Sequence, residues 1–189
     1  MEKSEKIILI LLLIIFVFLI CVLGFIKIGK KFKGGYVYFV KSDTEDTYLV
    51  KVERKLPLGS SVEKKIEVLI ENLLIGPTEK EERIGISTTL PEGVKLHKVE
   101  RNGDTVYIDF SEEIEQGGGT SLMETRLAQI VFTATQFPDV KKVKLLIDGK
   151  EIEYFSSEGI MVDKPLTKDD FVEFIKEEEE NERKNTSKI

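Results

Sequence analysis

The chain has 189 residues, 41% hydrophobic and 33% charged, which fits one globular domain with an accessory segment and excludes a disordered composition. Its formal net charge is −6, yet residues 1–33 hold six Lys and two Asp or Glu, so residues 34–189 hold 28 − 6 = 22 basic and 34 − 2 = 32 acidic groups. That acidic balance, without an Arg/Lys cluster interleaved with aromatic residues, argues against nucleic-acid binding.

The first element is an apolar run of 20 residues, Ile7 to Ile26, with neither charge nor proline. A helix of this length spans roughly 30 Å, the thickness of a bilayer core. A cleaved signal peptide would have a shorter apolar region, and the lone Cys21 follows Ile20, where a lipoprotein needs a small residue. We therefore expect a short tail at 1–6, a transmembrane signal-anchor helix at 7–28 and a tether at 29–35.

Lysines flank the predicted anchor unequally, with Lys3 and Lys6 before it and four lysines, at positions 27, 30, 31 and 33, after it. Counted alone, this bias places the following domain in the cytoplasm. We nevertheless expect the domain on the outer side of the membrane, because of the sequence motifs described at the end of this subsection.

The first half of the predicted domain, which covers 36–175, combines two strands with one main helix. Residues 36–41 and 48–54 have strand composition and flank a polar loop. Ser60 and Glu63 form a capping-box pattern, and the helix that they open has a buried stripe at helical spacing: Val62, Ile66, Leu69, Ile70, Leu73 and Leu74. Gly76-Pro77 ends that helix, and Thr78 with Glu81 forms a second capping box.

A hairpin and a loop come next. Residues 94–100 and 105–110 alternate like half-buried strands, and Asn102-Gly103 between them is a strong two-residue turn signal. Val106, Ile108 and Phe110 should face the core, with Tyr107 and Asp109 facing away. Residues 111–120 contain three consecutive glycines, and we expect a mobile loop there.

The second main helix is predicted at 127–137, where one face is apolar and Pro138 provides a stop: Leu127, Ile130, Val131, Ala134 and Phe137. A strand at 142–149 follows, with Val143, Leu145 and Ile147 inward and Lys142 and Lys144 outward, ending in an Asp148-Gly149 turn. A short strand at 151–155 and a last helix, capped by Thr167 and Asp170 and ending near Ile175, complete the domain. Residues 176–189 are charge-dense, and we expect a disordered tail.

Several motifs partly match known chemical sites. Residues 61–64 fit the S-x-x-K pattern of penicillin-recognising enzymes, but the other elements of that chemistry are missing. Glycines 117–119 lack the Gly-Lys-Ser/Thr ending of a phosphate loop. A calcium site at Asp109, Glu112 and Glu115 has no twelve-residue ligand loop, and the single His97 should be solvated. We predict no catalytic, cofactor-binding or metal-binding residues.

A polar stripe runs along the second main helix, formed by Arg126, Gln129, Thr133 and Gln136. The spacing places these side chains on one face, which we interpret as the solvated side of the helix. Because Gln and Thr lose water at less cost than Lys or Glu, this stripe is also our candidate for a protein contact surface.

Five segments together resemble a known family: 73–78 (LLIGPT), 90–94 (LPEGV), 106–111 (VYIDFS), 127–149 (LAQIVFTATQFPDVKKVKLLIDG) and 165–171 (PLTKDDF). They are similar, in collinear order, to the GerMN or Germane domain of sporulation and spore-germination proteins and of bacterial lipoproteins. The resemblance implies an α+β domain with two main helices on a small mixed or antiparallel sheet, similar to the ring-building modules of envelope machines. It also implies an exported location and offers no catalytic residues.

The expected function is therefore that of a single-pass, membrane-anchored, extracytoplasmic and non-enzymatic interaction module of the cell envelope, related to sporulation. Its partners would be envelope proteins or further copies of the chain, with membrane lipid around residues 7–26 and no nucleic acid or cofactor. The alternative is a domain that binds wall glycan or peptide, for which Tyr107 is the residue to test.

Overall fold

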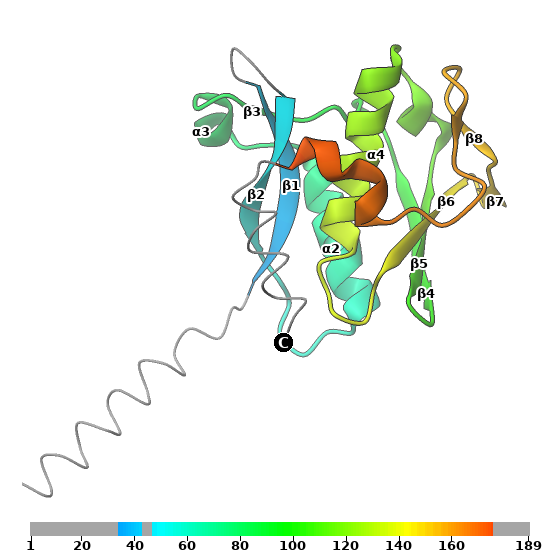
Figure 1. Cartoon of the computed structure of the whole chain (residues 1–189). Coiled ribbons are helices and arrows are strands. Elements are labelled where there is room, and N and C mark those ends of the chain that lie inside the picture. Colours follow the sequence, from blue (N-terminus) through cyan, green and yellow to red (C-terminus); the bar gives the residue numbers. More distant parts are fainter. Residues whose placement is uncertain (1–33, 43–46, 176–189) are drawn as a thin grey trace, which may run out of the picture. The chain divides into compact units, whose positions relative to one another are not determined.

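The computed structural model describes residues 34–42 and 47–175. The predicted anchor at 7–28, most of the tether and the predicted tail at 176–189 lie outside the described residues. Within the described residues, no helix combines the length and the apolar character that crossing a membrane requires. The described domain begins at Gly34 (Figure 1).

The first sheet is built on a long hairpin. Strand β1 (Gly34–Ser42) pairs antiparallel with β2 (Thr47–Lys55) over its whole length. On its other edge β1 pairs with the short β3 (Ile86–Ser87) only at Val40 and Lys41. The strand order is β2-β1-β3, so within the described part of the chain most of one edge of β1 has no strand beside it.

The second sheet has the order β4-β5-β6-β7 and mixes both directions. Strands β4 (Leu96–Asn102) and β5 (Thr105–Phe110) form an antiparallel hairpin, and β6 (Lys142–Ile147) runs parallel to β5. The short β7 (Lys150–Glu151) closes this sheet, and a separate hairpin of two-residue strands follows: β8 (Tyr154–Phe155) and β9 (Ile160–Met161). The α+β class is confirmed, but the strands divide between two sheets and a hairpin where one small sheet was expected.

Two helices dominate the domain, α2 (Val62–Ile75) and α4 (Thr120–Ala134). The shorter elements are α3 (Glu79–Glu82) and the 3₁₀ helices η1 (Glu112–Glu115) and η2 (Lys168–Phe174). The capping boxes at Thr78 and Thr167 are confirmed. The N-cap of α2 is Ser61, whose hydroxyl accepts from the Lys64 amide, so the prediction of Ser60 was one residue early.

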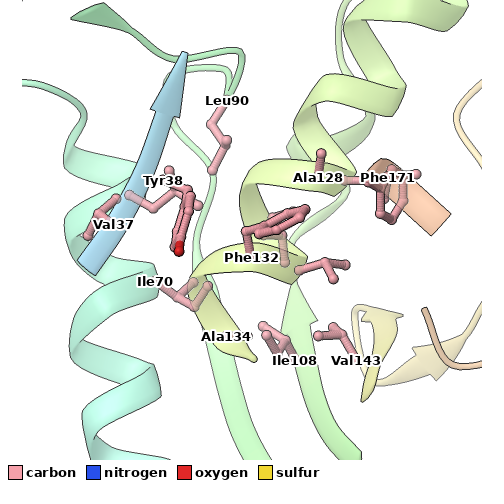
Figure 2. Close-up of a cluster of buried hydrophobic side chains, with 14 of the residues drawn as sticks. Val37, Tyr38, Ile70, Leu90, Ile108, Ala128, Phe132, Ala134, Val143 and Phe171 are labelled. Atoms are coloured by element: carbon pink, nitrogen blue, oxygen red, sulfur yellow. The ribbon is translucent and has the colours of Figure 1, made fainter. Parts of the chain in front are cut away.

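The core joins both sheets to both main helices, as Figure 2 shows for Tyr38, Ile70, Ile108 and Phe132. The stripe of α2 is buried as predicted at four positions: Ile66, Leu69, Ile70 and Leu73. The predicted inward residues of β5 are also buried: Val106, Ile108 and Phe110. Burying each such side chain contributes about 1.5–3 kcal/mol, so these stripes account for much of the stability.

Glycine allows β1 to approach α2 closely. A Cβ atom at Gly35 would lie 2.7 Å from the Leu69 Cδ1 atom and 3.0 Å from that of Leu56. Because Leu69 is fully buried, it has little room to move away from a larger residue at position 35.

Three local predictions need correction. The turn between β4 and β5 is Gly103-Asp104, one residue later than expected, because Asn102 pairs with Thr105. Helix α4 spans Thr120–Ala134 where 127–137 was predicted, so it begins seven residues earlier and ends three residues earlier; at its end the Thr135 hydroxyl donates to the Val131 carbonyl. Lys144 is 5% exposed instead of solvated, because its ammonium donates to the backbone carbonyls of residues 162 and 163 at 3.1 and 2.6 Å.

Candidate functional site

The predicted contact surface on α4 is mostly inside the protein. Arg126 is 1% exposed, Gln129 and Thr133 are 0% exposed, and only Gln136 is half-buried. The prediction of a solvated stripe is therefore wrong at the first three positions. The four side chains lie along α4 and the turn after it, and each bonds to the protein's own backbone.

Three of these side chains bond to the open edge of β1. The Gln136 side chain accepts from the Tyr36 amide and donates to the Tyr36 carbonyl, both at 2.7 Å. The Thr133 hydroxyl accepts from the Tyr38 amide at 3.1 Å, and the Gln129 amide donates to the Tyr38 carbonyl at 3.0 Å. Helix α4 and the turn after it thus supply hydrogen bonds that a neighbouring strand would otherwise make, which is why β1 needs only a two-residue β3 beside it.

Gln129 also holds the loop that follows β3. Its side-chain carbonyl accepts from the Thr89 amide at 2.9 Å and from the Thr89 hydroxyl at 2.7 Å. Its amide lies 3.4 Å from the Thr88 hydroxyl. One fully buried side chain therefore links α4, β1 and the 88–89 segment.

Arg126 links the same loop to η1. Its Nε and Nη2 donate to the Thr89 carbonyl at 2.9 and 2.7 Å, and its Nη1 donates to the Ile114 and Gln116 carbonyls at 2.6 and 2.8 Å. No carboxylate pairs with it among the described residues. Burial lowers the pKa of Arg126 because the charged form loses water. The guanidinium acts here as a rigid fork that joins two loops through their carbonyls.

The segment predicted as a loop at 111–120 contains the 3₁₀ helix η1, and the glycine segment 117–119 after it bonds to the β8–β9 hairpin. The Glu158 carboxylate accepts from the Gly119 amide at 2.9 Å, at the first turn of α4. The Glu115 carboxylate accepts from the Ser156 amide at 2.6 Å. These bonds tie the β8–β9 hairpin to the loop before α4, and a carboxylate already lies where a bound phosphate would have to sit.

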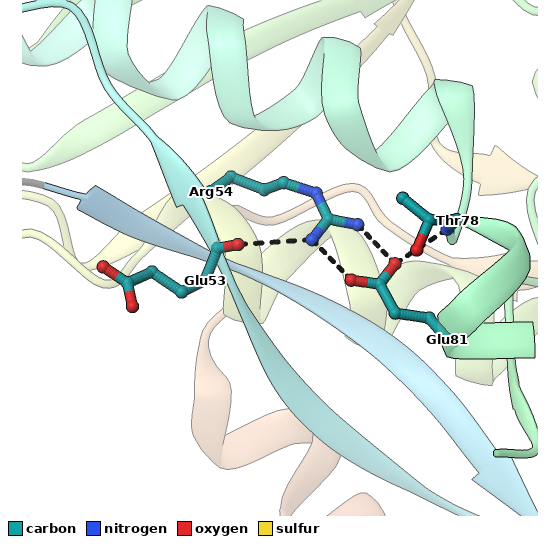
Figure 3. Close-up of polar contacts among 4 residues, drawn as sticks. All are labelled: Glu53, Arg54, Thr78 and Glu81. Atoms are coloured by element: carbon teal, nitrogen blue, oxygen red, sulfur yellow. Dashed lines mark hydrogen bonds and ion pairs between the residues drawn. The ribbon is translucent and has the colours of Figure 1, made fainter.

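A partly buried ion pair fixes α3 against the first sheet (Figure 3). Arg54 on β2 donates to both oxygens of Glu81, at 2.8 and 2.7 Å, and its guanidinium lies 5.4 Å from the centre of the Phe39 ring. The amide of Thr78 also donates to Glu81, at 2.7 Å. Arg54 and Thr78 together lower the pKa of the Glu81 carboxyl from 4.5 to about 2.

This ion pair predicts a loss of stability in acid. Because the Glu81 pKa is lower in the folded state, the unfolded chain binds the extra proton as the pH falls below about 4.5. The contribution is fully present above that pH and disappears as the pH approaches 2. Wild-type protein should lose about 1–3 kcal/mol more than Glu81→Gln over this range, measured by urea unfolding at each pH.

Arg83→Met is the control for that measurement, since the Arg83 side chain is 76% exposed. It should leave the pH dependence of unfolding unchanged. Parallel pH curves for wild-type protein and Glu81→Gln would contradict the assignment.

The remaining sequence candidates do not converge. His97 lies 3.0 Å from the Asp148 carboxylate on the surface. Asp109 accepts from the Gly149 amide at 2.9 Å, whereas Glu115 accepts from the Ser156 amide, so two of the carboxylates considered as calcium ligands serve different loops. Across residues 34–42 and 47–175, no three His, Cys, Asp or Glu side chains are grouped to hold a metal ion.

Two open depressions mark the surface of the described domain. One, of about 580 Å³, is lined by residues of α2, β4 and β5: Glu63, Val99, Glu100, Arg101, Asn102 and Tyr107. Within it Arg101 donates to Glu63 at 2.8 Å, which lowers the Glu63 pKa to about 2. The other, of about 410 Å³, lies between the end of α4 and η2 and includes Lys141, Lys142 and Lys168. Sequence reasoning gave Tyr107 as an outward residue but had no means of placing it beside Arg101 and Glu63.

Comparison with known proteins gives consistent matches. The family model Germane, described as sporulation and spore germination, matches residues 36–153. The spore germination protein GerM of Bacillus subtilis (strain 168) is 28% identical over 136 residues, which are 70% of this chain and 36% of that protein. The chain thus spans about a third of the length of this curated relative.

Solved structures support the same fold. The tandem GerMN domains of the sporulation protein GerM from Bacillus subtilis superpose with a TM-score of 0.59 at 26% identity, covering 71% of this chain and 45% of that one. The first GerMN domain alone gives 0.58 at 23% identity, covering 72% and 98%. A candidate lipoprotein from Clostridium perfringens gives 0.54 at 22% identity, covering 75% and 91%. The resemblance inferred from the sequence is confirmed, and the chain belongs to the Germane family.

Proposed function

We propose that this chain is a membrane-anchored, extracytoplasmic and non-enzymatic interaction module of the bacterial cell envelope, with envelope proteins or further copies of itself as partners. The observation that carries the proposal is membership of the Germane family, whose description is sporulation and spore germination. A spore germination protein and a candidate lipoprotein among the similar proteins favour a location at the envelope. The apolar run 7–26 in the sequence provides the means of attachment.

The polar side chains of α4 support a binding or assembly role over catalysis. Arg126, Gln129 and Thr133 are used in bonds to the protein's own backbone. The Germane family is not a known enzyme family.

Site-specific photo-crosslinking in native membranes tests the interaction. A photoreactive residue is placed at Ile84, Tyr154 or Val172, whose side chains are 61, 55 and 45% exposed. We expect a defined heavier adduct from at least one of them, identified by mass spectrometry. Lys98, at 63% exposed on β4, is the matched polar control. Only unlinked chain from every position would refute the proposal.

Protease treatment of intact, wall-stripped cells tests the location. Residues 34–189 should be digested if the domain is outside the membrane. Protection of the domain until the cells are opened would show that the lysine bias around the anchor sets the orientation.

A second candidate function is binding of wall glycan or peptide in the 580 Å³ depression. The observation in its favour is that Tyr107 is half-buried there beside Arg101, Glu63 and Asn102. An aromatic face next to charged and amide groups can stack on a sugar or peptide while the polar groups fix its orientation.

Tyr107→Ala is expected to reduce retention of the protein on purified wall material by about tenfold if this second function holds, because loss of a central aromatic contact costs about 1–2 kcal/mol. Pull-down at equal protein concentration measures it. Tyr154→Ala, which removes an exposed tyrosine elsewhere, should bind like wild type. Equal retention of all three proteins would eliminate the depression as a ligand site.

A further inference from the structure

One end of the domain, here called the Gly34 end, gathers the start of β1 with four other segments. Gly34 pairs with Lys55, so the loop 56–61 after β2 lies at this end. The start of α2 follows that loop and bonds to the end of β4 through Glu63 and Arg101. The Asp104 carbonyl accepts from the Lys141 amide, which brings the β4–β5 turn and the loop before β6 to the same end (Figure 1).

A rigid turn at the Gly34 end displays Leu58. The Leu58 side chain is 81% exposed, and it precedes Gly59, which has a φ of 73°. The Ser60 hydroxyl donates to the Pro57 carbonyl at 3.1 Å and braces the turn. Because the turn already exposes Leu58, this side chain can contact a lipid surface without a change in the backbone of the turn.

Two lysines at the Gly34 end are available to bind anions. At the Gly34 end, Lys55 and Lys141 are exposed, and neither has an ion-pair partner among the residues that the structure describes. The carboxylates of Glu63 and Asp104 at this end are engaged by Arg101 and Lys142. Strand β5 runs away from this end toward η1, which carries Glu112, Glu113 and Glu115. Two exposed carboxylates, Glu53 beside β1 and Asp139 in the loop before β6, also lie at the Gly34 end, so this end carries both signs of charge.

The length of the tether limits where the Gly34 end can be. In the proposed function the anchor ends near residue 28, and residues 29–33 can span at most about 18 Å. We propose that the Gly34 end rests on the phospholipid surface that holds the anchor, with Leu58 among the headgroups and Lys55 and Lys141 beside lipid phosphates. This inference rests on the membrane anchor of the proposed function, and it adds which face of the domain meets the lipid.

The test uses the full chain, with Cys21→Ser, reconstituted into vesicles of phosphatidylcholine and phosphatidylglycerol. A fluorescent probe is attached at Leu58→Cys or, as the matched control, at Ile75→Cys. Both side chains are 81% exposed, but they lie near opposite ends of α2, a helix of about 21 Å. Quenching by a nitroxide on the lipid headgroup should be several-fold stronger at position 58 than at position 75. Adding Lys55→Glu with Lys141→Glu should reduce the quenching at position 58 several-fold.

The outcomes separate this inference from the proposed function. If the chain floats with the vesicles to the top of a density gradient but the probe at position 58 is not quenched, the membrane anchor is supported and the proposed contact of the Gly34 end with lipid is refuted. Equal quenching at 58 and 75 would overturn it as well. A chain that stays at the bottom of the gradient would refute the anchor and, with it, this inference.

Discussion

Arg126→Met is expected to lower the free energy of unfolding by about 2–5 kcal/mol. The substitution leaves the Thr89 and Ile114 carbonyls without the donors that now lie 2.6–2.9 Å away. Each buried acceptor left unpaired costs about 1–3 kcal/mol. Methionine fills similar space, so a large cavity does not contribute. Urea unfolding at neutral pH measures the change.

Two further variants make that experiment specific. Arg126→Lys keeps the charge but lacks the planar guanidinium, which bonds to the Thr89, Ile114 and Gln116 carbonyls at once. It should therefore recover less than half of the unfolding free energy that Arg126→Met loses. Arg83→Met, at a 76% exposed position, should change stability by less than about 0.5 kcal/mol. If Arg126→Met were as stable as wild type, the cost of burying the charge would equal the gain from its hydrogen bonds.

Gln129→Leu is expected to cost about 3–4 kcal/mol. The leucine has nearly the same volume but cannot bond to the Tyr38 carbonyl or to the amide and hydroxyl of Thr89. Water cannot replace these bonds, because the Gln129 side chain is 0% exposed. Amide hydrogen exchange should show the loss at β1 and at residues 88–90 first, since those are the segments that Gln129 joins.

Gln136→Leu, in the turn that follows α4, is the comparison. Gln136 makes two bonds to Tyr36 and one to the Thr133 carbonyl, but it is half-buried, so water can take over part of this role. We expect a cost of about 1–2 kcal/mol. Equal costs for the two variants would mean that burial does not decide the value of these bonds, and the description of α4 as a substitute strand would need revision.

Much of the architecture follows from local sequence. The capping boxes at Thr78 and Thr167 were recognisable because each needs only four residues. The inward residues of β5 and the stripe of α2 were recognisable because strand and helix periodicities are local properties of the chain. Family membership was also evident from the sequence, since the motifs that carry it are contiguous.

The predicted site failed for a physical reason. A polar stripe on a helix normally faces water, and Arg126, Gln129 and Thr133 fit that pattern. The same side chains can instead form hydrogen bonds with the backbone of a strand edge or a loop, if the fold packs that backbone against the helix. Lys144 failed in the same way, because the backbone of residues 162–163 covers it.

The sequence by itself determined the type and order of the main elements, the family and the apolar run at 7–26, because each depends on residues close together in the chain. Only the tertiary structure decided where the polar groups find their partners. Residues 36–38 and 129–136 are separated by about 90 positions, and no local pattern records that they meet. A polar side chain shows that a hydrogen bond is needed, and the fold decides whether water or the protein's own backbone provides it.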